Sequence, residues 1–91
     1  MKLSLVQDQA IAARMALIVG AGNFDRLFRG IQFDAFDSKV LYVYAADEYR
    51  AAEIEDTFAL HIAITAGHIL NCEVPFVMVF PSKLKQGPEE N

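Results

Sequence analysis

The sequence contains no tryptophan and a single cysteine, Cys72, among its 91 residues. One cysteine excludes an internal disulfide and is compatible with a cytosolic protein. Every apolar stretch is shorter than the roughly 18 residues of a membrane-spanning helix. The first residues, MKLSLVQDQ, lack the apolar run of a signal peptide. We therefore expect a cytoplasmic protein without a membrane segment.

Basic residues are also scarce, since eight Lys and Arg stand against twelve Asp and Glu, for a net charge of −4. Proteins that bind nucleic acids use Lys and Arg on the phosphates, so this balance argues against a dedicated nucleic-acid binder. Hydrophobic residues make up 54% of the chain, which is enough for the core of one domain. The final residues, PSKLKQGPEEN, are polar. We expect one domain over residues 1–80 and a flexible tail over residues 81–91.

Residues 39–70 carry the strongest pattern. Residues 40–44, VLYVY, favour a strand, and no proline interrupts residues 47–70. Asp47 can accept backbone N–H groups at a helix start, and Asn71 stands where a left-handed residue ends a helix. Apolar residues recur at helical spacing, and this stripe consists of Ala51, Ile54, Phe58, Ile62 and Ile69. The pattern predicts a strand and then a helix of about 24 residues.

Two shorter helices are predicted before that strand. Alanines favour a first helix over residues 4–19, whose apolar side consists of Leu5, Ile11, Met15, Ile18 and Val19. Gly20 breaks it, and Asn23 can cap a second helix over residues 24–29, which Gly30 ends.

Residues 31–36 and 40–45 predict a hairpin, and residues 74–80 predict a third strand, with Pro75 at its beginning or at an edge. The sequence therefore predicts an α+β fold of order α-α-β-β-α-β, a three-stranded sheet with helices packed mainly on one face. The predicted core consists of Phe24, Leu27, Phe28, Leu41, Val43, Ile54, Phe58 and Ile62.

Residues 17–22, LIVGAG, imitate the glycine-rich entry of a dinucleotide-binding fold. The third glycine of that motif would be Asp25, whose charge would repel a pyrophosphate. We interpret the glycines as a helix end, and a strand over residues 12–19 would reverse this interpretation.

Three further residues are candidate metal ligands or nucleophiles. His61 and His68 lie seven residues apart, so on a helix about 10 Å separates them, too far for a shared zinc ion with ligands at ~2 Å. We interpret one as exposed and one as partly packed, and Cys72 as structural. No catalytic site assembles, and we predict no enzyme, no metal and no cofactor. Two acid pairs read as solvated charges, namely Asp34/Asp37 and Glu55/Asp56.

Three stretches carry a family resemblance: FDRLFRGI over residues 24–31, LYVYAADEY over residues 41–49, and ILN over residues 69–71. Together they resemble the N-terminal domain (domain I) of the bacterial replication initiator DnaA, over roughly residues 4–80. That domain has a KH-like fold of about this length and the same order of elements. The family has tryptophan in its first two helices and proline before the long helix, where this chain has Val6, Leu27 and Ala46.

The resemblance implies a non-enzymatic interaction module in chromosome replication initiation, which self-associates and docks the replicative helicase or an adaptor protein. In that family, a polar residue before the second helix and an aromatic residue starting the long helix contact the helicase. Those positions are Asn23 and Tyr49. The first helix serves self-association, which here means Leu5, Val6 and their neighbours.

Two alternatives stay open. The strand-helix-strand pattern is also similar to the C-terminal module of the polymerase clamp-loader subunit tau, a replisome interaction domain. KH-like folds also include single-stranded nucleic-acid binders, but this chain lacks their G-x-x-G loop and scatters its basic residues among acids. We expect weak or no binding of nucleic acid.

The residues alone also predict an interface on the sheet. Alternation directs Leu41 and Val43 toward the helices, and Tyr42 and Tyr44 toward the opposite face. Residues 74–80 are apolar on both sides, as in strands buried on both faces. One copy has too few helices to cover both faces, so we expect a homodimer. The alternative is that the tail or the first helix covers this patch.

Overall fold

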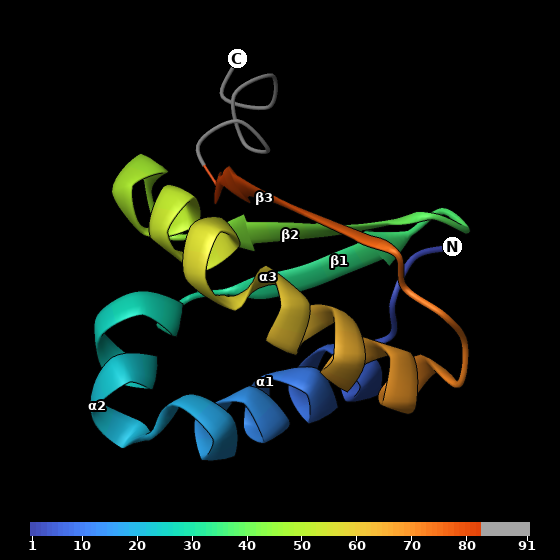
Figure 1. Cartoon of the computed structure of the whole chain (residues 1–91), viewed down its shortest axis with the longest axis horizontal. Helices are drawn as coiled ribbons and strands as arrows, with labels where there is room; N and C mark the ends of the chain where they lie inside the picture. The colour runs from blue at the N-terminus through green and yellow to red at the C-terminus, as the bar shows by residue number, and fades with distance from the viewer. Residues whose placement is uncertain (83–91) are drawn as a thin grey trace.

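The computed structural model describes residues 1–82, in which the helices lie on one face of a three-stranded sheet (Figure 1). The elements are α1 (Leu5–Val19), α2 (Ala21–Asn23), the π-helix η1 (Phe24–Phe28), β1 (Gln32–Phe36), β2 (Val40–Ala45), α3 (Glu48–Leu70) and β3 (Phe76–Pro81). The predicted α+β fold and its order are confirmed. Of the predicted tail, Pro81 belongs to β3, and residues 83–91 lie outside the described residues. None of the helices within residues 1–82 combines the length and apolarity required to cross a membrane.

The long helix α3 begins and ends where the sequence predicts. The Asp47 carboxylate accepts the backbone N–H of Arg50 at 2.9 Å, which satisfies one of the unpaired donors of the first turn. Asn71 ends the helix in the left-handed conformation at φ 59°. The buried residues of α3 are Ala51, Ile54, Ile62, Thr65 and Ala66, so the predicted stripe faces the core, with Thr65 and Ala66 added to it.

The chain leaves α3 through a close approach at Gly67. The Gly67 carbonyl accepts the backbone N–H of Cys72 at 3.1 Å. A Cβ atom at position 67 would lie 2.9 Å from the carbonyl oxygen of Cys72. Any larger residue would therefore push the returning chain away from the helix, which explains a glycine inside a helix where it ordinarily destabilises.

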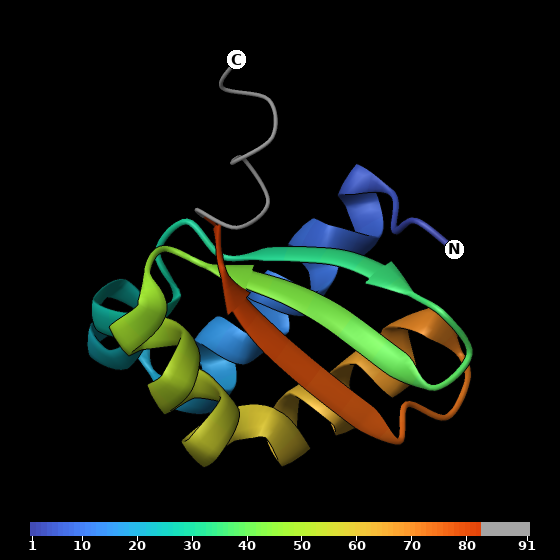
Figure 2. The same ribbon diagram turned by 90° about the horizontal axis from the view of Figure 1, so that it is seen from above.

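Strand β2 is the centre of the sheet. It pairs antiparallel with β1, for example Phe33 with Val43, and a register shift follows Phe33. It pairs parallel with β3, and Val43 lies opposite Val79. Parallel neighbours need a long crossover, and α3 supplies it by running back beneath the sheet (Figure 2). The predicted third strand begins two residues late, at Phe76, directly after Pro75.

The first residues of the chain cover the outer edge of β1. Lys2 forms an antiparallel bridge with Ala35, and the backbone N–H of Leu3 donates to the carbonyl of Asp34 at 2.9 Å. The backbone N–H of Phe33, by contrast, donates to the Asp8 carboxylate of α1 at 2.9 Å. Edge groups of β1 are therefore satisfied from both the N-terminal segment and α1.

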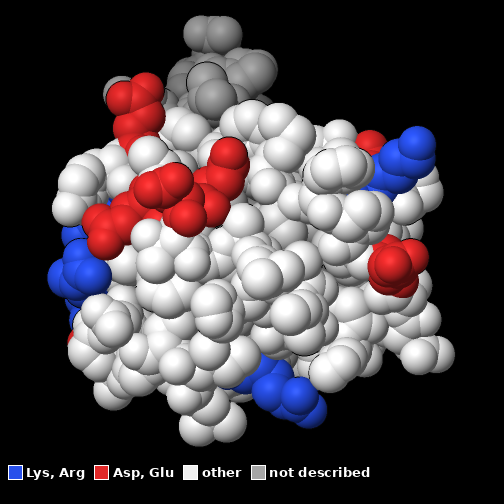
Figure 3. All heavy atoms as spheres, viewed as in Figure 1, with Lys and Arg blue, Asp and Glu red and all other residues white. Residues whose placement is uncertain are grey.

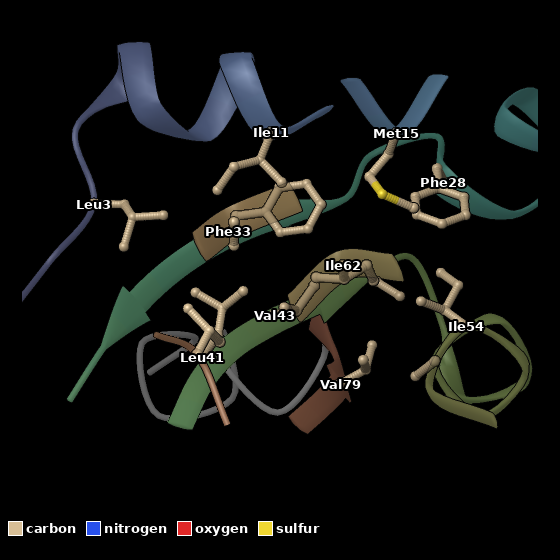
Figure 4. Close-up of a cluster of buried hydrophobic side chains, with 14 of the residues drawn as sticks. Leu3, Ile11, Met15, Phe28, Phe33, Leu41, Val43, Ile54, Ile62 and Val79 are labelled. Atoms are coloured by element: carbon tan, nitrogen blue, oxygen red, sulfur yellow. The ribbon is translucent and has the colours of Figure 1, made fainter. Parts of the chain in front are cut away.

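The core lies between the sheet and the helices. Figure 4 shows Ile11 and Met15 reaching from α1 toward Phe33 and Phe28. The buried hydrophobic residues are Leu3, Ile11, Met15, Leu27, Phe28, Phe33, Phe36, Leu41, Val43, Ala45, Ala51, Ile54, Ile62, Ala66, Val74 and Val79. Six of the eight predicted core residues are fully buried. Phe24 and Phe58 are only partly buried. Each packs its ring on the buried ring of Phe28, at 5.4 and 5.6 Å between centroids, and so lies at the border between the core and the surface.

The second helix differs from its prediction over residues 24–29. It begins directly after Gly20 as α2 and continues into the π-helix η1. Asn23 has helical dihedrals and caps nothing; its side-chain amide donates to the Val19 carbonyl at 3.1 Å. The predicted cap is wrong because Gly20, with φ 89°, already makes the break between helices, and Asn23 serves the end of α1 instead.

We expect Asp47→Ala to lower the melting temperature by about 5 °C at pH 7, because it removes the cap of α3. The pKa of Asp47 lies below its ordinary value of 3.8, chiefly because the Arg50 backbone N–H bonds the carboxylate. A lowered pKa means that this stabilisation is complete above pH 3.8 and is lost as the pH falls through the folded-state pKa. Thermal unfolding of both proteins at pH 7 and at strongly acid pH should therefore show a smaller difference in acid.

Asp25→Ala is the matched control, since Asp25 is an exposed acid whose bonding partner within residues 1–82 is Arg29, four residues on. It should leave the melting temperature nearly unchanged. An equal loss from both substitutions, or a pH-independent loss at position 47, would contradict the capping role.

Candidate interaction surfaces

The face of the sheet away from the helices is apolar and aromatic. Its side chains come from alternate residues of β2 and β3, which lie side by side in the parallel register. We call this surface the open face, and it consists of Val40, Tyr42, Tyr44, Phe76, Met78 and Phe80. No helix or strand of residues 1–82 lies over it (Figures 1 and 2). Phe76 is 59% exposed and Met78 is 42% exposed, so apolar surface is presented to solvent.

The aromatic rings of the open face order one another. Tyr42 stacks on Phe80 with 6.4 Å between centroids and 17° between planes. Tyr44 lies 5.9 Å from the same ring. Such contacts hold large, rigid side chains in place without closing the surface. The open face is therefore preorganised for contact with another apolar surface.

Asp37 fixes one end of the open face through the hairpin turn. Its carboxylate accepts the backbone N–H of Val40 at 3.1 Å and the hydroxyl of Tyr42 at 2.9 Å. The Val40 bond, followed by the Tyr42 bond, holds the pKa of Asp37 below its ordinary value of 3.8. The bond to Asp37 raises the pKa of Tyr42 above 10.0. At neutral pH the charge thus stays on Asp37, at the border of the face.

The two residues that the resemblance assigns to helicase contact are both exposed but contact different neighbours. The side chain of Asn23 accepts a bond from Arg26 at 3.3 Å. Tyr49, 68% exposed, lines a depression with Val79 and Pro81 at the end of β3.

Arg26 connects the two regions. Its carbonyl accepts Nε of Arg50 at 2.8 Å, and its guanidinium lies 3.6 Å from the carboxylate of Glu53. Arg26 therefore connects η1 to the first turns of α3. One of its partners there, Arg50, directly follows Tyr49 in the chain.

Helix α1 carries the remaining residues predicted for self-association. Leu5 is 69% exposed and Val6 is 76% exposed. The predicted apolar side of this helix is correct for Ile11 and Met15, which are buried, and wrong for Leu5 and Ile18, which face solvent. Leu5 and Val6 are adjacent at the start of α1 and Ile18 lies near its end, so the exposed apolar positions of this helix do not form one patch.

The other candidate sites gain no support. Residues 12–19 belong to α1, so the strand required for dinucleotide binding is absent from that segment. Both histidines are exposed, and the prediction of one partly packed histidine is wrong, although His61 lies edge-on to Phe58 at 5.9 Å. Across residues 1–82, no group of three or more His, Cys, Asp or Glu is placed to hold a metal ion.

Two of the acids read as solvated instead bond the backbone of strands. One is Asp37 in the hairpin. The other is Glu55, whose carboxylate accepts the backbone N–H of Val79 in β3 at 2.8 Å. No pattern in the sequence indicates this bond, because it joins two elements that only the tertiary fold brings together. Asp34 pairs with Lys2 at 2.9 Å.

Comparison of this sequence with protein-family models and with curated proteins gives no match. The functional argument therefore depends on the geometry of the surfaces. Among the described residues, the open face combines exposure, apolar character and order, and it is the strongest candidate for a functional site.

We expect the Tyr42 hydroxyl to titrate above pH 10, and Asp37→Asn to bring its pKa back toward 10, because the neighbouring negative charge is removed. The measurement is the ultraviolet absorbance of tyrosinate in a Tyr44→Phe/Tyr49→Phe background, which isolates Tyr42. The pKa of Tyr42 is higher in the folded state than in the unfolded state. The Tyr42–Asp37 bond therefore contributes its full stability to the folded protein below pH 10, and this contribution is lost as the pH rises through the folded-state pKa. Asp34→Asn, an acid paired with Lys2, is the control. Identical Tyr42 titrations in Asp37→Asn and in the parent would contradict the bond.

Proposed function

We propose that this chain is a non-enzymatic protein–protein interaction module that self-associates through its open face. The observation that carries the proposal is the exposure of Phe76 and Met78 beside tyrosines already ordered by stacking. Apolar surface in water costs roughly 25 cal/mol per Å², and burial against a partner recovers that free energy. Because the rings are held in place before contact, little conformational entropy is lost when the face is covered.

A second copy of the chain is the partner that this chemistry favours. None of the six residues of the open face is charged, and the nearby charge of Asp37 is directed to the border by its bond to Tyr42. Two such faces can meet around a two-fold axis without bringing like charges together at the centre. An aromatic centre with a polar border is also the usual anatomy of an interface.

The cellular role in this proposal is assembly of a complex that initiates bacterial chromosome replication in the cytoplasm. This part rests on the resemblance of residues 24–31, 41–49 and 69–71 to the initiator domain, and the order of elements supports it. The second surface, around Asn23 and Tyr49, is then the docking site for a replicative helicase or adaptor protein. Self-association and docking use separate surfaces, so one assembled copy can carry a partner.

The wild-type chain should sediment as a dimer at micromolar concentration, and Tyr42→Glu with Tyr44→Glu should weaken dimerisation by ~100-fold or more, because unpaired charges would be buried at its centre. Analytical ultracentrifugation measures the association, and circular dichroism checks that the variant is folded. Leu5→Glu with Val6→Glu is the matched control on α1 and should leave the dimer intact.

A wild type that stays monomeric at several hundred micromolar would overturn self-association. Dissociation by the Leu5/Val6 pair but not by the tyrosine pair would move the interface to α1 and overturn the role of the open face.

Tyr49→Ala should weaken binding to the replicative helicase by roughly 1–2 kcal/mol, because an exposed tyrosine offers rigid apolar area with a polar tip. Stability should change little, since the side chain is 68% exposed. Isothermal titration with the purified helicase measures the binding, and Tyr49→Phe is the conservative control. If the melting temperature collapses while binding per folded molecule is unchanged, Tyr49 serves the fold and not the partner.

A further inference from the structure

Strand β3 is an edge of the sheet, and half of its backbone groups point away from β2. The backbone N–H of Phe76 donates to the Lys39 carbonyl beside β2 at 3.1 Å. Because parallel strands use alternate residues on each side, Val77 and Val79 direct their N–H and C=O groups to the outer edge. The bond from the Val79 N–H to Glu55 agrees with this direction. Pro81 has no N–H, so among the described residues the Val77 N–H is the donor at this edge of β3 that remains for a further strand.

Helix α3 extends beyond β3 on this side of the sheet (Figure 2). Residues of α3 and of the chain from Cys72 to Pro81 together line a groove there. It consists of three adjoining depressions. The first, of about 780 Å³, ends at Glu55, which also lines the second. The second shares Leu60, Ala63 and Pro75 with the third. We call this the edge groove. Its floor on α3 includes Ala52, Ala59 and Ala63, whose small side chains leave room beside the strand.

The charges of the edge groove are concentrated at one end. The acids that line the first depression are Glu48, Glu53, Glu55 and Asp56, and Figure 3 shows acidic side chains gathered over this end of the molecule. Glu53 is offset by Arg26. Within residues 1–82, no cation pairs with Glu48 or Asp56. The middle of the groove, around Ala59 and Ala63, is uncharged.

We propose that the edge groove binds an extended segment of another protein that alternates lysine or arginine with small apolar residues. The segment adds to β3 as a fourth strand, with its backbone bonded to the N–H and C=O of Val77. Alternate side chains of a strand point to opposite faces, so the lysine or arginine side chains enter the groove, where the acids lie. The small apolar side chains then point to the other face, beside Phe76 and Met78. Main-chain bonds supply affinity and the groove supplies selectivity, as in other strand-addition sites.

Glu55 is the residue that adapts when the segment binds. In the free chain its carboxylate occupies the position at the Val79 N–H where a carbonyl of an added strand belongs. The incoming carbonyl takes that bond, and the released carboxylate pairs with a lysine or arginine of the segment. A second copy of β3 is disfavoured as occupant, because β3 (Phe76–Pro81) carries no lysine or arginine to pair with the acids of the groove.

The first test uses a capped hexapeptide of alternating lysine and valine with the full-length protein. Nuclear magnetic resonance should show the Val77 amide exchanging at least tenfold more slowly when the peptide is present. An alternating glutamate–valine peptide should bind at least tenfold more weakly. Two further peptides carry N-methyl groups, one on all of its valine amides and the other on all of its lysine amides. A strand turns alternate amides toward its neighbour, so only one of these two peptides should fail to bind the protein.

The second test uses protein variants. Ala59→Arg fills the groove and should remove peptide binding, whereas Ala13→Arg, at an exposed position of α1, should not. Glu48→Gln with Asp56→Asn should weaken the lysine peptide severalfold and flatten its salt dependence. Asp25→Asn with Asp34→Asn, which changes the charge equally, should have a smaller effect because both acids lie outside the edge groove, where they pair with Arg29 and Lys2.

Four results would overturn the proposal. They are no binding at millimolar peptide, equal binding of the lysine and glutamate peptides, unchanged binding of both N-methylated peptides, and shifts confined to the open face. If the Val77 amide is already protected from hydrogen exchange in the free monomer, another part of the chain covers the edge. If protection appears only as the protein concentration rises, a second copy covers it. Either outcome also overturns it.

Discussion

All helices of this chain pack against one face of its sheet, and the rest of the structure depends on that one-sided burial. Leu41 and Val43 of β2 are fully buried against the helix layer that includes Ile54 and Ile62. Because β3 pairs parallel with β2, α3 must return beneath the sheet to connect them. No further element of residues 1–82 remains to cover the opposite face or the outer side of β3. The open face and the edge groove therefore both follow from the topology.

Strand β3 contributes to both surfaces in different ways. Its residues Phe76, Met78 and Phe80 direct side chains to the open face, and Val77 directs backbone groups to the edge groove. One surface thus uses side chains and the other uses the main chain of the same strand. Occupation of one does not remove the groups that the other needs, so the two contacts are compatible in a single copy.

Features set by neighbouring residues could be predicted from the sequence. Helical spacing located α3, and the residue types Asp47 and Asn71 located its ends, because capping is decided within one turn. Alternation in β2 separated buried Leu41 and Val43 from the tyrosines of the open face. The element order, and with it the expectation of an uncovered sheet face, followed from these local patterns.

Features that depend on distant contacts could not be predicted. Glu55 looked like a solvated helix residue, since its strand partner lies 24 residues away. Gly67 had no apparent role until the returning chain placed the Cys72 carbonyl beside it. Asparagine at position 23 is typical of a helix N-cap, but its side-chain amide donates to the carbonyl of Val19, at the end of the preceding helix α1. The edge groove is likewise a product of how α3 lies against β3, which no single segment encodes.

The pairing of residues 1–3 with β1 leaves the two edges of the sheet unequal, because it covers the β1 edge. A sheet that offers two bare edges can add copies without limit and grow into a fibre. Here the backbone N–H of Leu3 and the carbonyl of Met1 already bond to β1, so β3 is left as the side for extension. A second copy of β3 is disfavoured at that side, so the sheet does not continue from one copy to the next. Each molecule consequently takes up one segment at one edge, and the size of the resulting sheet is defined.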